Sequence, residues 1–226
     1  MGYRFLITAL FSYGLLFGSG VLASSDVRQS ASSHSVLVLG DSISAAYGID
    51  KRRGWVALLE QRLAPQCPSI NIHNASVSGE TSAGGLARLP ALLATHQPRL
   101  LVVELGGNDG LRGLSPGQMS KNLQQMFRLA AAADAQVALL GMLMPPNLGA
   151  AYVRLFEQAM RDAAVDESVL FLEFFLQGVA SQRALLQADG LHPTAAAQPR
   201  LLDNAWQILE QPLAKICQSQ TGVSAL

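Results

Sequence analysis

Residues 36–49 read VLVLGDSISAAYGI, in which an apolar run of four residues leads into a glycine, an aspartate and a serine. A short apolar run that ends in a turn residue is typical of a buried strand. Ser42 stands just past the expected end of that strand. It is either a nucleophile held at the strand's end or a polar residue that merely opens a loop. The rest of the chain has to decide between these two interpretations.

Short apolar runs and amphipathic stretches alternate along the chain from residue 36 onward. Apolar residues at helical spacing indicate helices, and uninterrupted apolar runs rich in β-branched residues indicate strands. This alternation predicts an α/β fold with right-handed crossovers and a parallel sheet that carries helices on both faces. The expected strands lie in residues 35–40, 69–77, 99–106, 135–143 and 168–175, and the expected helices lie in residues 54–64, 84–96, 115–133, 149–165 and 194–216.

Prolines and capping residues bear on three of the expected helix starts. Ser115 is a suitable N-cap, with Pro116 in the first helical position. Pro90 lies inside an apolar helical pattern, where it would interrupt the backbone hydrogen bonds, so the regular helix is expected to start near it. Pro199 is either tolerated in the first turns of the last helix or marks the place where that helix starts.

Length and charge restrict the class of protein. The chain has 226 residues, of which half are hydrophobic and 14% are charged, and its formal net charge is zero. That length suits one α/β domain with a substantial core. Because no basic patch stands out, nucleic acid is not an expected partner. No segment after the N-terminus is long and apolar enough to cross a bilayer, so the mature protein is expected to lack a membrane span. The protein is expected to be a monomer.

The N-terminal segment has the features of a secretory signal. Arg4 is the only charged residue before Asp26, and residues 5–17 form an apolar h-region, FLITALFSYGLLF. Val21 and Ala23 fit the −3 and −1 positions of a cleavage site, which predicts an exported and periplasmic protein. An uncleaved membrane anchor is the alternative. The expected organisation is a signal peptide over residues 1–23, a leader over 24–34, a folded domain over 35–217 and a C-terminal tail over 218–226.

Export affects the interpretation of the two cysteines, Cys67 and Cys217. In an oxidising compartment they are candidates for a disulfide. Cys67 follows the first expected helix and Cys217 lies in or after the last one, and a flavodoxin-like order would place both helices on one face of the sheet. Two unrelated thiols fit the sequence equally well. The spacing fits neither a zinc site nor a redox CxxC motif.

Polar residues gather at four places that this fold brings to one edge of the sheet. In open α/β sheets, functional groups collect at the C-terminal ends of the strands. GDS (40–42), NASVSGE (74–80) and GGNDG (106–110) follow the first three expected strands, and ADGLHP (188–193) precedes the last helix.

His192 differs from the other three histidines because Asp189 stands three residues before it. Within one tight turn such a carboxylate reaches Nδ1 of the imidazole, which fixes the tautomer and leaves Nε2 free as a base. The backbone N–H groups of Ser42 and Gly79 and the side-chain amide of Asn108 are suited to hold an oxyanion. Each feature alone also fits an ordinary loop, in which a glycine supplies positive φ or an aspartate stabilises a turn. Their combination favours nucleophilic catalysis.

In this order, GDS, Gly79, GGND and DGLHP resemble the four signature blocks of the SGNH (GDSL-type) hydrolases. VVELGGNDGLRG and PPNLGAAY resemble the bacterial thioesterase I branch, periplasmic enzymes that also act as lysophospholipases and arylesterases. The resemblance covers roughly residues 36–213. It implies a flavodoxin-like three-layer α/β/α sandwich with a five-stranded parallel sheet in the order 2-1-3-4-5. It also implies that no metal or organic cofactor is needed.

The resemblance further assigns roles to residues of this sequence. It makes Ser42 the nucleophile, His192 the general base and Asp189 the acid that orients the base, with Gly79, Asn108 and the backbone N–H of Ser42 in the oxyanion hole. The reaction it implies is hydrolysis of carboxylic esters and acyl thioesters through an acyl-enzyme intermediate. The residues expected to contact the substrate are Tyr47, Leu111, Met144, Pro145 and Leu148.

Five charged residues near these blocks are expected to act structurally. Glu104 lies in a strand that otherwise reads as buried, so it must be hydrogen-bonded or paired. Asp41 and Asp109 are expected to accept backbone N–H bonds in their loops, and Arg88 and Arg112 to brace loops or face solvent.

Two other functions remain open at this point. One is an esterase of the same family that acts on acetylated carbohydrate. The other is a non-catalytic periplasmic binding domain, which the full set of nucleophile, base, acid and oxyanion donors disfavours because a binder has no use for a triad.

Overall fold

The computed structural model of the chain describes residues 1–2, 35–165 and 168–218. The expected signal peptide and leader lie outside the described residues apart from residues 1–2, and the expected tail lies outside them apart from Gln218.

Five parallel strands form one sheet in the order β2-β1-β3-β4-β5, which confirms the expected order. The two strands at its centre, β1 and β3, are buried along their whole length. This is the pattern of strands covered on both faces, and it explains why their sequences are almost uninterrupted apolar runs. The strands are β1 (Ser35–Gly40), β2 (Asn71–Asn74), β3 (Leu100–Glu104), β4 (Gln136–Leu140) and β5 (Val169–Leu172).

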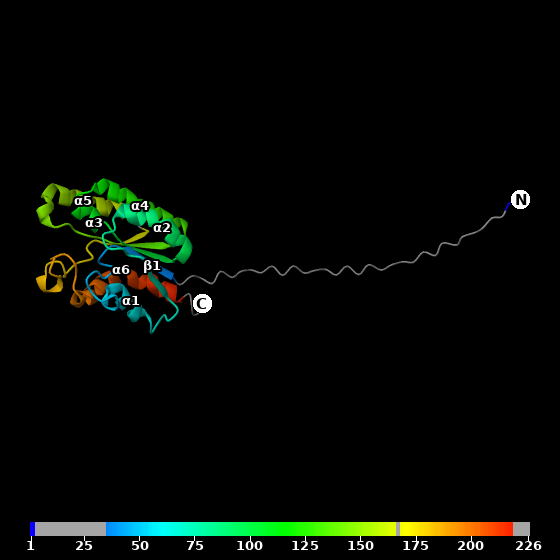
Figure 1. Cartoon of the computed structure of the whole chain (residues 1–226), viewed down its shortest axis with the longest axis horizontal. Coiled ribbons are helices and arrows are strands. Elements are labelled where there is room, and N and C mark those ends of the chain that lie inside the picture. The colour runs from blue at the N-terminus through cyan, green and yellow to red at the C-terminus, as the bar shows by residue number, and fades with distance from the viewer. Residues whose placement is uncertain (3–34, 166–167, 219–226) are drawn as a thin grey trace. The chain divides into compact units, whose positions relative to one another are not determined.

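Helices cover both faces of the sheet and complete the expected three-layer sandwich (Figure 1). One layer holds α1 (Trp55–Leu63) and α6 (Gln198–Gln218), which pack against each other. The other holds α2 (Ser82–His96), α4 (Pro116–Ala132) and α5 (Ala150–Ala163). The shorter helices are α3 (Gly107–Leu111), η1 (Lys51–Arg53), η2 (Pro146–Leu148), η3 (Arg183–Leu185) and η4 (Ala195–Ala197).

The start of α2 differs from the prediction. The helix begins at Ser82 and runs through Pro90. Its start is set by Thr81, whose hydroxyl accepts a hydrogen bond from the N–H of Gly84 at 3.3 Å. A cap of this kind satisfies one of the free N–H groups of the first turn. The proline removes a single backbone hydrogen bond, and the buried face of the helix, which includes Leu89 and Leu93, keeps the two halves together.

The other two proline predictions hold. Ser115 caps α4 by accepting from the N–H of Gln118 at 3.3 Å, and Pro116 takes the first helical position. Pro199 lies in the first turn of α6, which begins at Gln198. A proline there is tolerated because its missing N–H would have had no partner within the helix.

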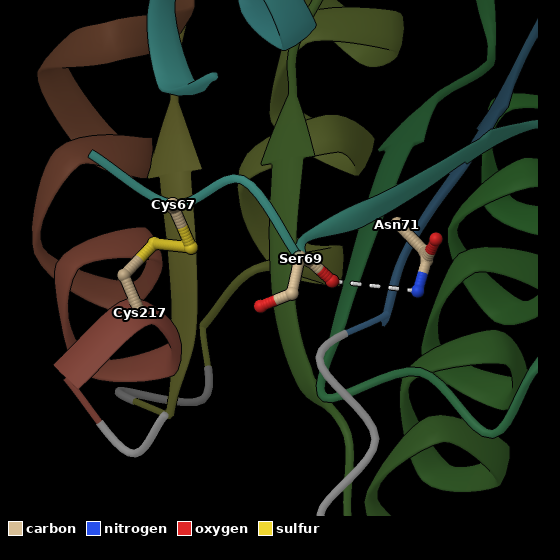
Figure 2. The surroundings of a disulfide bond; sticks show 4 residues. All are labelled: Cys67, Ser69, Asn71 and Cys217. Carbon is tan, nitrogen blue, oxygen red and sulfur yellow. Dashed lines mark hydrogen bonds between the residues drawn. A yellow bond between two sulfur atoms is a disulfide. The ribbon is translucent and has the colours of Figure 1, made fainter. Parts of the chain in front are cut away.

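A disulfide joins Cys67 to Cys217 and ties the α1 and α6 layer together (Figure 2). The two Cα atoms are 5.4 Å apart. Cys67 is fully buried between the end of α1 and the start of β2, and Cys217 lies in the last turn of α6. Of the two alternatives that the sequence left open, the structure has the paired one. The bond lies near the N-terminal ends of the strands, at the opposite edge of the sheet from Ser42.

Candidate active site

Ser42, His192 and Asp189 form a connected chain of hydrogen bonds at the C-terminal edge of the sheet. Ser42 Oγ lies 3.0 Å from His192 Nε2, and His192 Nδ1 lies 2.7 Å from Asp189 Oδ2. The turn after η3 places the acid, because Asp189 Oδ1 accepts from the backbone N–H groups of Leu191 at 2.9 Å and of His192 at 3.0 Å. The spacing of three residues between Asp189 and His192 therefore corresponds to one tight turn.

These hydrogen bonds also fix the charge of Asp189. The N–H of Leu191, followed by the ring and the backbone N–H of His192, stabilises the ionised form and lowers the pKa of Asp189 to about 2. Asp189 is therefore a carboxylate throughout the pH range in which an imidazole titrates. A carboxylate there is suited to orient the ring and to stabilise an imidazolium.

The turn that carries Ser42 starts directly after β1. The N–H of Ala45 donates to the carbonyl of Asp41 at 3.0 Å, and the N–H of Tyr47 donates to the carbonyl of Ser42 at 3.0 Å. The Asp41 side chain caps the turn by accepting from the N–H of Ile43 at 3.0 Å. This helical turn at the end of a parallel strand lifts Ser42 Oγ towards the cleft.

Gly79 and Asn108 line the same cleft as Ser42. Gly79 has φ +79°, a conformation that a residue with a Cβ rarely adopts, and its carbonyl accepts from the Arg112 guanidinium at 2.8 Å. Asn108 Nδ2 donates to Asp41 Oδ2 at 3.0 Å. Since a side-chain amide has two hydrogens to donate, one hydrogen of Asn108 orients the group and the second is available to a ligand.

Asp41 connects the turn that carries Ser42 to Asn108. Its carboxyl group is buried, and this burial raises its pKa to about 6, against the opposing effects of the Ile43 N–H bond, the nearby His192, the adjacent carboxyl group of Glu104 and the bond from Asn108. At neutral pH Asp41 is therefore ionised and holds the amide of Asn108 in place.

The loop-bracing roles predicted for the neighbouring charges are confirmed. Asp109 accepts from the N–H of Ser82 at 2.8 Å and from its hydroxyl at 2.6 Å, which ties α3 to the start of α2. Arg88 pairs with Glu80 at 2.7 Å and donates to the carbonyl of Ala75 at 2.9 Å. Together with the bond from Arg112, these contacts brace the loop that carries Gly79 from two sides.

A cleft of about 840 Å³ opens beside Ser42 and His192. Four of the five predicted substrate contacts line it, and Tyr47 also packs its ring against His192, with centroids 4.6 Å apart. Leu148 is not among the residues that line the cleft. Because η2 turns the chain after Pro145, Leu148 packs against the hydrophobic core instead. The four predicted contacts that line the cleft are Tyr47, Leu111, Met144 and Pro145.

The loop after β5 forms a wall of the cleft that the sequence analysis missed. Its contribution is mostly apolar, with no acid or base. The signal was present, because FFLQGVAS continues past the C-terminal end of a parallel strand, where sites of this fold assemble. An apolar stretch of this kind carries no acid, base or nucleophile that would mark it as part of a site in the sequence. The lining residues from this loop are Phe174, Leu176, Gln177, Gly178, Ala180 and Ser181.

The part of the chain that the structure describes contains no group of three or more His, Cys, Asp or Glu side chains arranged to hold a metal ion. Nor does it contain a helix that combines the length and apolarity needed to span a membrane.

Comparison with known proteins identifies the family. The family model for the GDSL-like lipase/acylhydrolase family matches residues 38–199. Esterase TesA of Pseudomonas aeruginosa is 52% identical over 192 residues, covering 85% of this chain and 96% of that protein. Thioesterase 1/protease 1/lysophospholipase L1 of Escherichia coli K12 is 41% identical over 186 residues, covering 82% and 87%. The crystal structure of TesA superposes with a TM-score of 0.76 at 52% identity, covering 79% of this chain and 99% of that one. The chain thus belongs to the GDSL-like lipase/acylhydrolase family and is a serine hydrolase of ester bonds.

Proposed function

We propose that the chain cleaves carboxylic esters and acyl thioesters with Ser42 as nucleophile, His192 as general base and Asp189 as the acid that orients the base. The observation that carries this proposal is the unbroken contact chain of 3.0 Å from Ser42 Oγ to His192 Nε2 and 2.7 Å from His192 Nδ1 to Asp189. A hydroxyl, an imidazole and a carboxylate so connected form a nucleophile with its base and its orienting group.

The reaction proceeds in two halves. His192 Nε2 takes the proton of Ser42 as Oγ attacks the carbonyl carbon of the substrate. The negative charge that develops on the carbonyl oxygen accepts hydrogen bonds from the backbone N–H groups of Ser42 and Gly79 and from Asn108 Nδ2. His192 then gives its proton to the departing alcohol or thiol. Water, deprotonated by the same imidazole, repeats the attack on the acyl-enzyme and releases the acid.

The shape and lining of the cleft support an acyl chain as the group that is bound. Its volume of about 840 Å³ exceeds what an acetyl group fills, and Leu111, Met144 and Phe174 give it apolar walls. This favours arylesterase, lysophospholipase and acyl-CoA thioesterase types of activity on a small-molecule or lipid substrate. A monomeric enzyme is part of the same proposal. The alternative is a carbohydrate acetyl esterase. A series of acyl esters and thioesters of increasing length, set beside acetylated xylan and peptidoglycan, separates the two.

We also propose that the enzyme is exported to the periplasm after cleavage behind Ala23. The apolar residues 5–17 and the small residues before the cut support this. The bond between Cys67 and Cys217 gives independent support, since disulfides persist in oxidising compartments.

Substitution of Ser42 tests the proposed chemistry. Ser42→Ala should abolish hydrolysis of p-nitrophenyl butyrate and labelling by a fluorophosphonate probe, with the circular dichroism spectrum and Tm of the wild type. The alanine removes only one oxygen atom from a half-buried side chain that lines the cleft, so no change in the fold is expected. Turnover close to the wild-type rate in a folded Ser42→Ala protein would refute the assignment of the nucleophile.

A further inference from the structure

Glu104 is a buried carboxyl group beneath the Ser42 turn that the proposed reaction does not use. It is the last residue of β3, and its partner in register on β1 is Gly40, two residues before Ser42. Its side chain is fully buried. A buried carboxyl group is costly unless hydrogen bonds compensate for the lost water. The partners of Glu104 therefore show what it stabilises.

Within the described part of the chain, the side chain of Glu104 accepts hydrogen bonds only from the turn of residues 41–44. Glu104 Oε2 accepts from the hydroxyl of Ser44 at 2.7 Å, from the N–H of Ser44 at 3.2 Å and from the N–H of Asp41 at 3.4 Å. These donors stand on both sides of Ser42. One oxygen atom thus restrains the backbone just before and just after the serine.

Trp55 fixes which atom donates in the hydrogen bond between Ser44 and Glu104. Its indole N–H donates to Ser44 Oγ at 3.1 Å, so the hydroxyl accepts from the indole and gives its only hydrogen to Glu104. The backbone N–H of Trp55 donates in turn to Gln198 Oε1 at 2.9 Å. The turn is therefore anchored to both helices of the α1 and α6 layer.

Gly40 makes room for the contact. A Cβ at this position would lie 2.8 Å from Glu104 Oε2 and 2.7 Å from the Cβ of Ser44. Such approaches are too close for any side chain, and both neighbours are held in place by their hydrogen bonds. The glycine of the GDS block is thus required for Glu104 to reach the turn.

Glu104 and Asp41 are adjacent buried carboxyl groups, and Glu104 is the one that holds a proton. Glu104 Oε1 has no hydrogen-bond partner among the described residues, whereas both oxygens of Asp41 accept bonds, from the N–H of Ile43 and from Asn108. Two adjacent buried carboxyl groups do not both ionise. Burial, followed by the charge of Asp41, raises the pKa of Glu104 well above its ordinary value. Asp41 carries the charge and Glu104 remains a neutral acid.

We propose that Glu104 is a positioning residue for ester hydrolysis, which as a neutral carboxylic acid holds the turn of residues 41–44 so that Ser42 Oγ meets His192. The proposal rests on the proposed role of Ser42. Loss of the restraint loosens the alignment of nucleophile and base, while the apolar walls of the cleft outside this turn, such as Leu111, Met144 and Phe174, stay in place. The effect is therefore expected in kcat and not in KM.

Three variants test the proposal on p-nitrophenyl butyrate. Glu104→Ala removes the shared acceptor, so kcat should fall about 10- to 100-fold with KM changed less than about twofold. Glu104→Gln is neutral and keeps an oxygen for the three donors, so it should restore most of the kcat lost in Glu104→Ala. Ser44→Ala should lower kcat as well. Adding it to Glu104→Ala should cost little more, because both changes break the same bond.

Two controls separate positioning from stability. Labelling to completion with the fluorophosphonate probe counts active sites, so kcat is expressed per folded enzyme. Leu213→Ala, a core variant in α6, should lower Tm without lowering kcat per labelled site.

Infrared difference spectra of wild type against Glu104→Gln at about pH 8, where Asp41 is ionised, should show the C=O band of a protonated carboxylic acid in the wild type alone.

Each outcome bears on a separate part of the reasoning. Wild-type kcat per labelled site in Glu104→Ala overturns the positioning role, and a Glu104→Gln protein as impaired as Glu104→Ala overturns the neutral acid. Should Glu104→Ala fail to fold, Ser44→Ala and Trp55→Phe carry the test, and normal kcat in both overturns the proposal. Activity in Ser42→Ala refutes the proposed function itself. An inactive Ser42→Ala beside a normal Glu104→Ala refutes only the role of Glu104.

Discussion

Opening the disulfide should destabilise the fold strongly without touching the chemistry. The bond between Cys67 and Cys217 closes a loop of 150 residues. In the chain-entropy model a crosslink over that distance restricts the unfolded chain by about 5 kcal/mol, at the upper end of the 2–5 kcal/mol typical for removing a native disulfide. For a domain of this size each kcal/mol corresponds to roughly 2–4 °C in Tm. Complete loss of the bond should therefore lower Tm by about 10–20 °C.

The assay compares thermal unfolding of three samples by circular dichroism. These are the oxidised wild type, the wild type in reductant, and the Cys67→Ala/Cys217→Ala double variant. Reduction keeps every atom of the core, so it controls for the small cavity that the alanines leave. Hydrolysis of p-nitrophenyl butyrate at 25 °C should stay at the wild-type rate in all three, because the bond lies at the far edge of the sheet from Ser42. Two free thiols in the wild type isolated without reductant would refute this reasoning. So would a Tm of the reduced wild type and the double variant that lies less than about 3 °C below that of the oxidised wild type.

Two further predictions follow from single side chains. Asn108→Ala removes the side-chain donor of the proposed oxyanion hole and should lower kcat by roughly 10²–10³, and an unchanged kcat would exclude Asn108 from the hole. His73 stacks on His96 with centroids 4.1 Å apart, and burial, followed by the neighbouring His96, lowers its pKa. The folded state therefore disfavours protonation of His73. The contribution of neutral His73 to stability is complete above the pKa of the unfolded state and is lost as pH falls through the lowered pKa of the folded state. His73→Phe should reduce the fall in Tm between about pH 7.5 and 5.5, whereas an equal fall in both proteins would contradict this account.

The sheet could be predicted almost completely because its strands are buried on both faces. Uninterrupted apolar runs such as β3 have few alternative interpretations, and their alternation with amphipathic stretches dictates the layers. The start of α2 was harder to predict, because Pro90 is a stronger local signal than the cap at Thr81. Tertiary packing of the helix outweighs the one hydrogen bond that the proline removes.

The polar half of the site was more predictable than the apolar half. The residue types and spacing of Ser42, Asp189 and His192 indicate a site in the sequence, and the structure brings all three together. Leucines and phenylalanines are equally common in cores and in clefts, so neither the inward turn of Leu148 nor the wall that includes Phe174 is visible in the sequence. The buried role of Glu104 was expected in outline, and only the structure shows that its partners belong to the turn of Ser42.

The contact between Ser42 and His192 joins two residues that are 150 positions apart in the chain. In the proposed mechanism Ser42 is a nucleophile only beside its base, and during synthesis Ser42 joins the chain long before His192. Under that mechanism, hydrolysis begins only after the segment that carries His192 has folded against the turn of Ser42. The order in which the chain is made and folded would then set the onset of the proposed activity.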